Sequence, residues 1–90
     1  MTTLERAIET YGEDMQLNVA IEEFSELIKE ICKHKRGKEN FPNIVEEMAD
    51  CYIMLEQLKI IFGIKNSSIY AMMEQKLERL KNRLDEVREG

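Results

Sequence analysis

Apolar residues recur every three or four positions along most of this 90-residue chain, as they do on helices that bury one face. The pattern predicts four helices joined by short connections. They should span about residues 3–11, residue 12 or 13 to a fading end within 33–38, residue 40 or 43 to about 62, and 66 to about 89. Gly12, Gly37 and Gly63 are expected at helix ends, where a residue without a side chain is favoured.

The start of the third helix has two alternatives. Either Asn40 caps it and Pro42 lies in its first turn, or Asn43 caps it with Glu46 as the capping-box acid. In both cases two long helices are joined by a short loop, so they should pack as an antiparallel helical hairpin. We expect the fourth helix to cover one side of this hairpin, giving an all-α, four-helix-type bundle in one domain over residues 1–90. Because so short a chain buries a limited core, oligomerisation should complete the bundle.

Composition narrows the function classes. Charged residues make up 34% of the chain and there is one proline, a profile that suits helices better than a many-stranded β fold. The formal net charge of −5 argues against a nucleic-acid partner. Cys32 and Cys51 fall inside helical apolar patterns and form no zinc motif, so we expect both to be small buried residues. The chain shows neither a signal-peptide pattern nor an apolar run of membrane-spanning length, which predicts a cytoplasmic protein with no membrane partner.

Four acids form two pairs on the long central helices. Glu23 and Glu26 lie on the second predicted helix, Glu47 and Asp50 lie on the third, and each pair is spaced i,i+3 so that both carboxylates project from one face. Oxygen ligands that converge from two facing helices suit a hard cation such as Mg²⁺. Spacing alone says little, since a chain with 18 acids in 90 residues contains roughly three such pairs by chance.

The position of these acids on their helices is more informative than their spacing. At about 100° per residue, Glu47 falls inside the apolar arc of its helix, with Asp50 at the edge of that arc. Glu23 and Glu26 border the apolar arc of the second helix. An ionised carboxylate facing a core costs roughly several kcal/mol unless it is paired or metal-bound. The sequence therefore predicts either a metal site or a cluster of ion pairs with basic residues of the fourth helix.

The register of the two helices poses a difficulty. If the second helix persists to Arg36, Glu26 lies further from the loop than Glu47 does, by on the order of one turn at 1.5 Å rise per residue. For the four acids to meet, either the helix frays near Lys33 or the loop doubles back.

The chain resembles the MazG-like superfamily of all-α nucleotide pyrophosphohydrolases. The hallmark of that superfamily is EExxE followed on the next helix by ExxD, which here read Glu22-Glu23-Phe24-Ser25-Glu26 and Glu47-Met48-Ala49-Asp50. The match extends over nearly the whole chain, including the preceding stretch from Ala7 to Gly12. Chain length and helix order add to the specificity of a short, Glu-rich motif.

The resemblance implies a function. Members bind Mg²⁺, for which Mn²⁺ could substitute, and hydrolyse nucleoside triphosphates between the α- and β-phosphates to a monophosphate and pyrophosphate, as in house-cleaning of the nucleotide pool. It implies that Glu23, Glu26, Glu47 and Asp50 hold the metal and carry the catalysis, and that the protein is a homodimer or homotetramer. Phosphoribosyl-ATP pyrophosphohydrolase is an alternative substrate assignment. A non-catalytic helical module that self-associates is an alternative from another class.

Substrate contacts are expected outside the acids. Lys76, Arg79 and Arg83 form a basic strip on the fourth helix that suits phosphate oxygens, although a solvated or intersubunit salt-bridge strip explains the two arginines equally well. The family carries a functional lysine in this part of the helix, which favours Lys76. The resemblance also makes Gln16 a candidate for the base pocket. The single histidine, His34, is expected on the surface.

Overall fold

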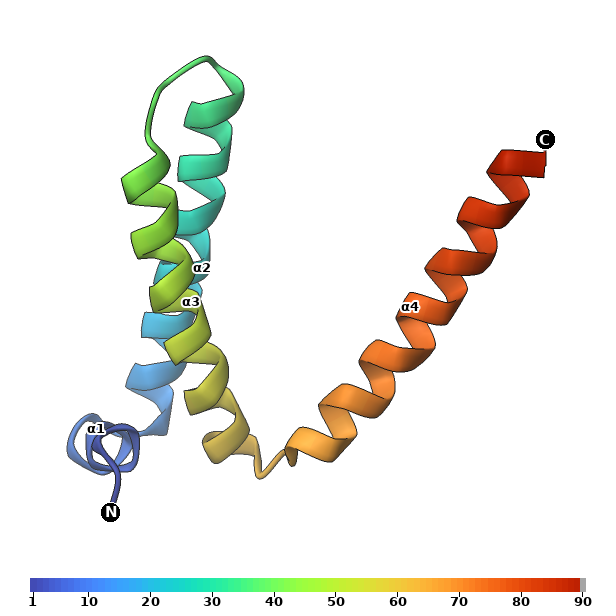
Figure 1. Cartoon of the computed structure of the whole chain (residues 1–90). Helices are drawn as coiled ribbons and strands as arrows, with labels where there is room; N and C mark the ends of the chain where they lie inside the picture. The colour runs from blue at the N-terminus through green and yellow to red at the C-terminus, as the bar shows by residue number, and fades with distance from the viewer. Residues whose placement is uncertain (90) are drawn as a thin grey trace.

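The computed structural model describes residues 1–89, and within them the chain is entirely helical (Figure 1). Helix α1 spans Thr3–Tyr11, α2 spans Glu13–Lys35, α3 spans Phe41–Phe62 and α4 spans Asn66–Glu89. The sequence prediction of an all-α chain with four helices is confirmed. Within the same residues, no helix is both long enough and apolar enough to cross a membrane.

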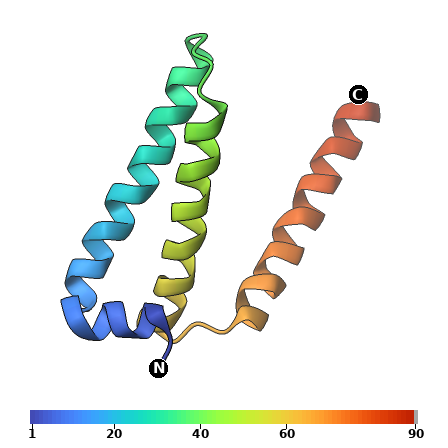
Figure 2. The same ribbon diagram turned by 60° about the vertical axis from the view of Figure 1, so that its left-hand side comes forward.

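Helix α1 is fixed at both ends by local chemistry. The Thr2 hydroxyl accepts from the Glu5 backbone N–H at 3.1 Å, and the Glu5 carboxylate accepts from the Thr2 N–H at 2.9 Å, which completes a capping box. Gly12 ends the helix with φ of 89°, a conformation that L side chains rarely adopt. Helix α1 lies across one end of the molecule, where it contacts both α2 and α3 (Figure 2).

The chain runs along α2, turns in residues 36–40 and returns along α3, which lies beside α2 in both views (Figures 1 and 2). Helix α3 starts by the first of the two alternatives, with Asn40 at the N-cap and Pro42 in the first turn. The Asn40 side chain makes no capping bond. Its Nδ2 donates instead to the Glu30 carbonyl at 2.9 Å, inside a buried setting.

This bond resolves the register difficulty. Helix α2 does not fray near Lys33 but continues to Lys35, where the Lys38 N–H reaches back to the Lys33 carbonyl at 3.1 Å and Gly37 adopts φ of 96°. The loop then doubles back, so that Asn40 lies beside Glu30 rather than beside the end of α2. As a result α3 is displaced along α2 by more than a turn, which brings the two acidic motifs level.

The interface between α2 and α3 is more polar than the apolar pattern predicts. Alongside Ala20, Cys51 and Met54, its buried positions include four polar residues, namely Gln16, Glu30, Asn40 and Gln57. Several large apolar residues that the pattern placed toward the core are exposed instead: Ile21, Ile28, Ile31, Leu55 and Phe62. The expectation for Cys51 is correct, but Cys32 is exposed, because it lies on the side of α2 turned away from α3.

Helix α4 departs from the expected arrangement. It leaves α3 at Gly63 and diverges from the other helices instead of covering the α2–α3 pair (Figures 1 and 2). The radius of gyration is 17.0 Å, whereas a compact chain of this length has about 12 Å. The expectation that α4 completes the bundle within its own chain is therefore wrong.

Candidate metal centre

Three of the four predicted acids converge between α2 and α3. Glu23 of α2 and Glu47 and Asp50 of α3 each offer a carboxylate oxygen, and these oxygens all lie within 4.8 Å of one another. The i,i+3 spacing places Glu47 and Asp50 one turn apart on the side of α3 that meets α2. All three side chains are half-buried. The site is thus open to solvent on one side and enclosed by two helices on the other.

Crowding of negative charge changes how these groups titrate. The pKa of Glu23 is raised from 4.5 to about 7, first by a hydrogen bond shared with Asp50, then by burial and by the charges of Asp50, Glu47 and Glu26. Burial is the main cause that raises the pKa of Glu47, followed by repulsion from Asp50 and Glu26. At neutral pH, Glu23 is therefore divided between a protonated form that donates to Asp50 and an ionised form.

No basic side chain compensates this charge in the chain as described. The four ion pairs within residues 1–89 involve other acids: Glu26, Glu30, Glu56 and Asp85. Oε2 of Glu47 is buried and has no hydrogen-bond partner. A buried carboxylate oxygen without a donor is costly, and a cation would satisfy it. Helix α4 diverges from α2 and α3 and carries its basic residues away from these acids (Figure 1). The structure therefore does not support the alternative of ion pairs between the acids and α4 of the same chain.

Glu26 is a neighbour of the three acids rather than a member of the cluster. Its carboxylate pairs with Lys29 on the same helix at 3.1 Å and is about half exposed. It lies close enough for its charge to raise the pKa of both Glu23 and Glu47. Glu26 is therefore positioned at the open side of the site, where it could meet a ligand.

The structure adds Glu30, which the sequence reasoning missed. Glu30 lies seven residues after Glu23 on the same face of α2, and its charge contributes to the raised pKa of Glu47. Hydrogen bonding from Asn43 is the main cause that lowers the pKa of Glu30, and Lys33 lies 3.3 Å from its Oε2. The recurrence of acids at 23, 26 and 30 on one face was the signal that could have identified it.

Cys51 joins the two helices beside the acids. Its thiol donates to the Glu23 carbonyl at 3.6 Å, and burial is the main cause that raises its pKa. A thiol kept protonated in this way acts as a weak hydrogen-bond donor and not as a nucleophile or a metal ligand. Its contribution is to hold α3 against α2 at the level of the site.

The predicted substrate contacts are divided between two places. Gln16 is buried on α2, about two turns before Glu23 and on the same face. Lys76, Arg79 and Arg83 are exposed on α4, which carries them away from the carboxylates within one chain (Figure 1). The structure thus places Gln16 on the same helix face as Glu23, but it does not bring the basic strip of α4 near the acids. His34 is exposed, as expected.

The donor set fits Mg²⁺. Ligand oxygens about 2.1 Å from an octahedral ion lie at most about 4.2 Å apart, so oxygens within 4.8 Å of one another need only a slight contraction to share one ion. Carboxylates alone are the ligands of hard cations, and softer metals would favour nitrogen or sulfur. Comparison of the chain with protein-family models, curated proteins and solved structures gives no match.

Proposed function

We propose that this protein is a Mg²⁺-dependent nucleoside triphosphate pyrophosphohydrolase of MazG-like type, with Mn²⁺ able to substitute. One observation carries the proposal: Glu23, Glu47 and Asp50 converge from two helices, no basic side chain within residues 1–89 pairs with them, and one buried oxygen of Glu47 has no partner. A protein that needed only structural ion pairs would supply basic residues at this position, as it does for Glu26 and Glu30. The resemblance of the EExxE and ExxD motifs supports the same assignment.

The reaction would hydrolyse the bond between the α- and β-phosphates. The oxygen of a water molecule forms a bond to phosphorus, the anhydride bond breaks, and the products are a nucleoside monophosphate and pyrophosphate. Bound Mg²⁺ would neutralise phosphate charge and acidify a water molecule. Glu23, Glu47 and Asp50 would hold the ion. Glu26, which lies beside them and is about half exposed, would accept a proton from the attacking water.

The phosphate-binding cations belong to the proposal as well. Lys76, Arg79 and Arg83 would contact phosphate oxygens only if α4 moved or if a second copy supplied them, because their own α4 diverges from the site (Figure 2). A homodimer or homotetramer with sites between subunits satisfies this condition. Gln16 would face the base from the buried side of α2.

A direct assay tests the proposal. Pyrophosphate release should be measured with and without Mg²⁺ from a panel of nucleoside triphosphates and from phosphoribosyl-ATP. Metal-dependent release from a nucleoside triphosphate supports the proposal, whereas release from phosphoribosyl-ATP alone moves the assignment to the other substrate. If no compound is cleaved and Mg²⁺ leaves the melting temperature unchanged, the chain is better described as a non-catalytic helical self-association module.

A further inference from the structure

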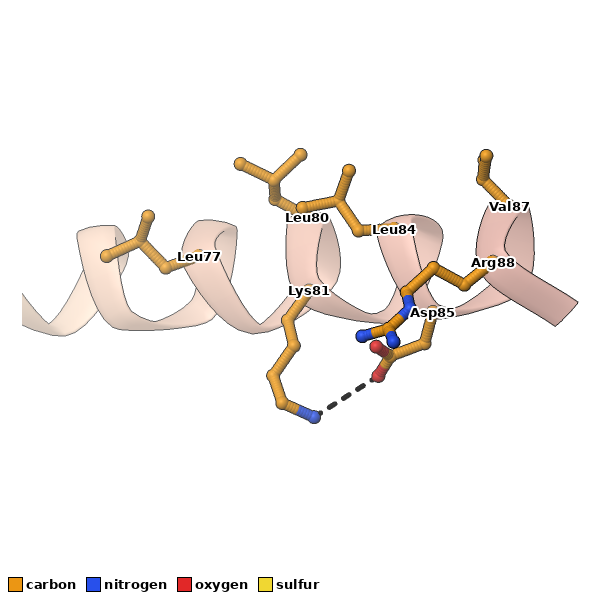
Figure 3. A pocket seen from close by; sticks show the side chains of 7 residues that line it. All are labelled: Leu77, Leu80, Lys81, Leu84, Asp85, Val87 and Arg88. Carbon is orange, nitrogen blue, oxygen red and sulfur yellow. Dashed lines mark hydrogen bonds and ion pairs between the residues drawn. The ribbon is translucent and has the colours of Figure 1, made fainter.

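Helix α4 carries a long apolar seam that nothing in its own chain covers. Met73, Leu77, Leu80, Leu84 and Val87 follow one another at spacings of four, three, four and three, the repeat of helices that pair along a seam. Their exposed fractions run from 43% to 76%. In Figure 3, the leucines and Val87 project to one side of the helix, while Lys81, Asp85 and Arg88 lie toward the other.

A second uncovered apolar face lies on the α2–α3 pair. On each helix, the residue directly after each position that faces the other helix is apolar. These residues form one stripe on each helix: Leu17, Ile21, Phe24, Ile28 and Ile31 on α2, and Val45, Met48, Tyr52 and Leu55 on α3. All four of these α3 residues are exposed, including Tyr52 at 68%. Because α3 returns along α2, a shift of one residue, about 100°, turns both stripes to the same side of the pair. They form one broad face, which we term the α2–α3 face.

The exposed area sets how much of this surface a partner must cover. The chain exposes 7522 Å², whereas a folded monomer of 10.6 kDa exposes about 5,500 Å². The excess of roughly 2,000 Å² for each chain is larger than the roughly 800 Å² that each partner buries in a standard interface, and it falls in the range of obligate dimers. An excess of this size is what the association of two copies would bury.

Charge decides which surface the α4 seam meets. Lys76 and Arg83 border one side of the seam, and Glu74, Lys81 and Arg88 border the other, so two α4 seams packed in parallel would place basic residues against basic residues. One of the four basic residues, Lys81, is partly neutralised by Asp85 at 3.3 Å. Residues 1–65 hold 13 of the 18 acids and only 8 of the 13 basic residues. The mainly basic borders of the seam are thus complementary in charge to the acidic remainder of the chain.

From these observations we infer that α4 of one copy packs across the α2–α3 face of a second copy, and that the exchange is reciprocal. Each chain then buries its α4 seam and its α2–α3 face in the same dimer. The linker of Gly63, Ile64 and Lys65 already directs α4 outward from its own chain, as such an exchange requires (Figure 1). This inference rests on the fold and the exposed surfaces, and it stands independently of the proposed chemistry.

Two single variants test the two halves of the interface. Leu80→Glu places a charge in the α4 seam, and Tyr52→Glu places one in the α2–α3 face. Light scattering coupled to size exclusion should give the wild type at least twice the chain mass of 10.6 kDa, and both variants the mass of one chain at the same concentration. Asn82→Glu adds the same charge on the opposite side of α4 and should leave the mass of the wild type. Circular dichroism that retains the helices of α1–α3 would separate dissociation from unfolding.

Mixing the two variants distinguishes the exchange from other dimers. A Tyr52→Glu copy has an intact α4, and a Leu80→Glu copy has an intact α2–α3 face, so equimolar mixing should restore a dimer through one of the two interfaces. A wild-type monomer, in which α4 folds onto its own chain, would overturn the inference. So would a Tyr52→Glu protein that remains dimeric while Leu80→Glu dissociates, because that pattern indicates two α4 seams packed together. Activity assays are not needed for either result.

Discussion

Glu23 on α2 and Asp50 on α3 bring carboxylate oxygens within 4.8 Å of each other across the helix interface, and hydrogen bonding to Asp50 is the main cause that raises the pKa of Glu23 to about 7. The two carboxylates can be joined in this way only while one of them holds a proton. The site therefore has two ways to relieve the same repulsion: a proton between the acids, or a cation among them. The first prediction follows from the competition between the two.

Without metal, the carboxyl of Glu23 should make the protein less stable as pH rises. Since the folded pKa of about 7 lies above the ordinary value of 4.5, the stabilising contribution is fully present below pH 4.5 and is lost by about pH 7. Glu5 and Glu30, whose pKa values are lowered, act in the opposite sense. Thermal unfolding of wild type and Glu23→Gln, each in chelator, isolates the effect: the variant should gain stability relative to wild type from pH 5 to pH 8. A constant difference would contradict the raised pKa.

Metal binding should release a proton and strengthen with pH. Because Mg²⁺ must displace the proton shared by Glu23 and Asp50, its affinity should rise between pH 5.5 and pH 7.5 and then level off. Calorimetric titration of Mg²⁺ or Mn²⁺ in two buffers of different ionisation enthalpy measures the proton released. In Glu23→Gln, the release and its pH dependence should both decrease to what Glu47, whose pKa is also raised, contributes. An affinity that does not change with pH would place the ion elsewhere.

Glu47→Gln should separate stability from activity. The amide has nearly the size of the carboxylate but removes an inward negative charge beside Asp50 and Glu26, so the metal-free protein should melt at a higher temperature. Pyrophosphate release should fall by more than about 100-fold, since even indirect supports of a metal ligand cost about 10–100-fold when they are lost. Glu78→Gln, the same substitution at an exposed position of α4, is the control and should change neither quantity. Destabilisation of Glu47→Gln with activity retained would indicate a structural ion pair.

Asn40→Ala should destabilise the loop between α2 and α3 and lower the free energy of unfolding. The substitution removes the buried bond from Asn40 Nδ2 to the Glu30 carbonyl and leaves that oxygen without this donor. The expected loss is about 1–2 kcal/mol of unfolding free energy, measured by urea denaturation. Asn82→Ala, on the exposed side of α4, should change it by less than about 0.5 kcal/mol. Because Asn40 also sets the register of the acids, metal affinity should fall together with stability only in the first variant.

Local chemistry in the sequence was enough to place the helices. The Thr2 and Glu5 capping box and the glycines at 12, 37 and 63 act within a few residues, and all four helices begin within a residue or two of the expected positions. The three converging acids could be predicted for a related reason. An acid inside an apolar arc, such as Glu47, conflicts with its own helix and needs a partner.

Properties that depend on two separated segments could not be predicted. The sequence left open whether α2 frays or the loop doubles back, because the bond between Asn40 and the Glu30 carbonyl, formed where the loop returns, is not recorded by any periodic pattern. The apolar arcs alone do not distinguish residues that face a helix of the same chain from residues that face another chain. For that reason Ile28 and Leu55 were compatible with a core, although both are exposed in the single chain.

In the inferred dimer, the angle at which the chain leaves Gly63 determines the size of the assembly. Two copies form a closed dimer only when each α4 can pack on the α2–α3 face of the other copy at the same time. If the linker at Gly63, with φ of 64°, held α4 at another angle, the second α4 would remain free and would recruit a third molecule, then a fourth. A residue other than glycine there disfavours this backbone conformation, so a single substitution in the linker could convert a finite particle into an open-ended fibre.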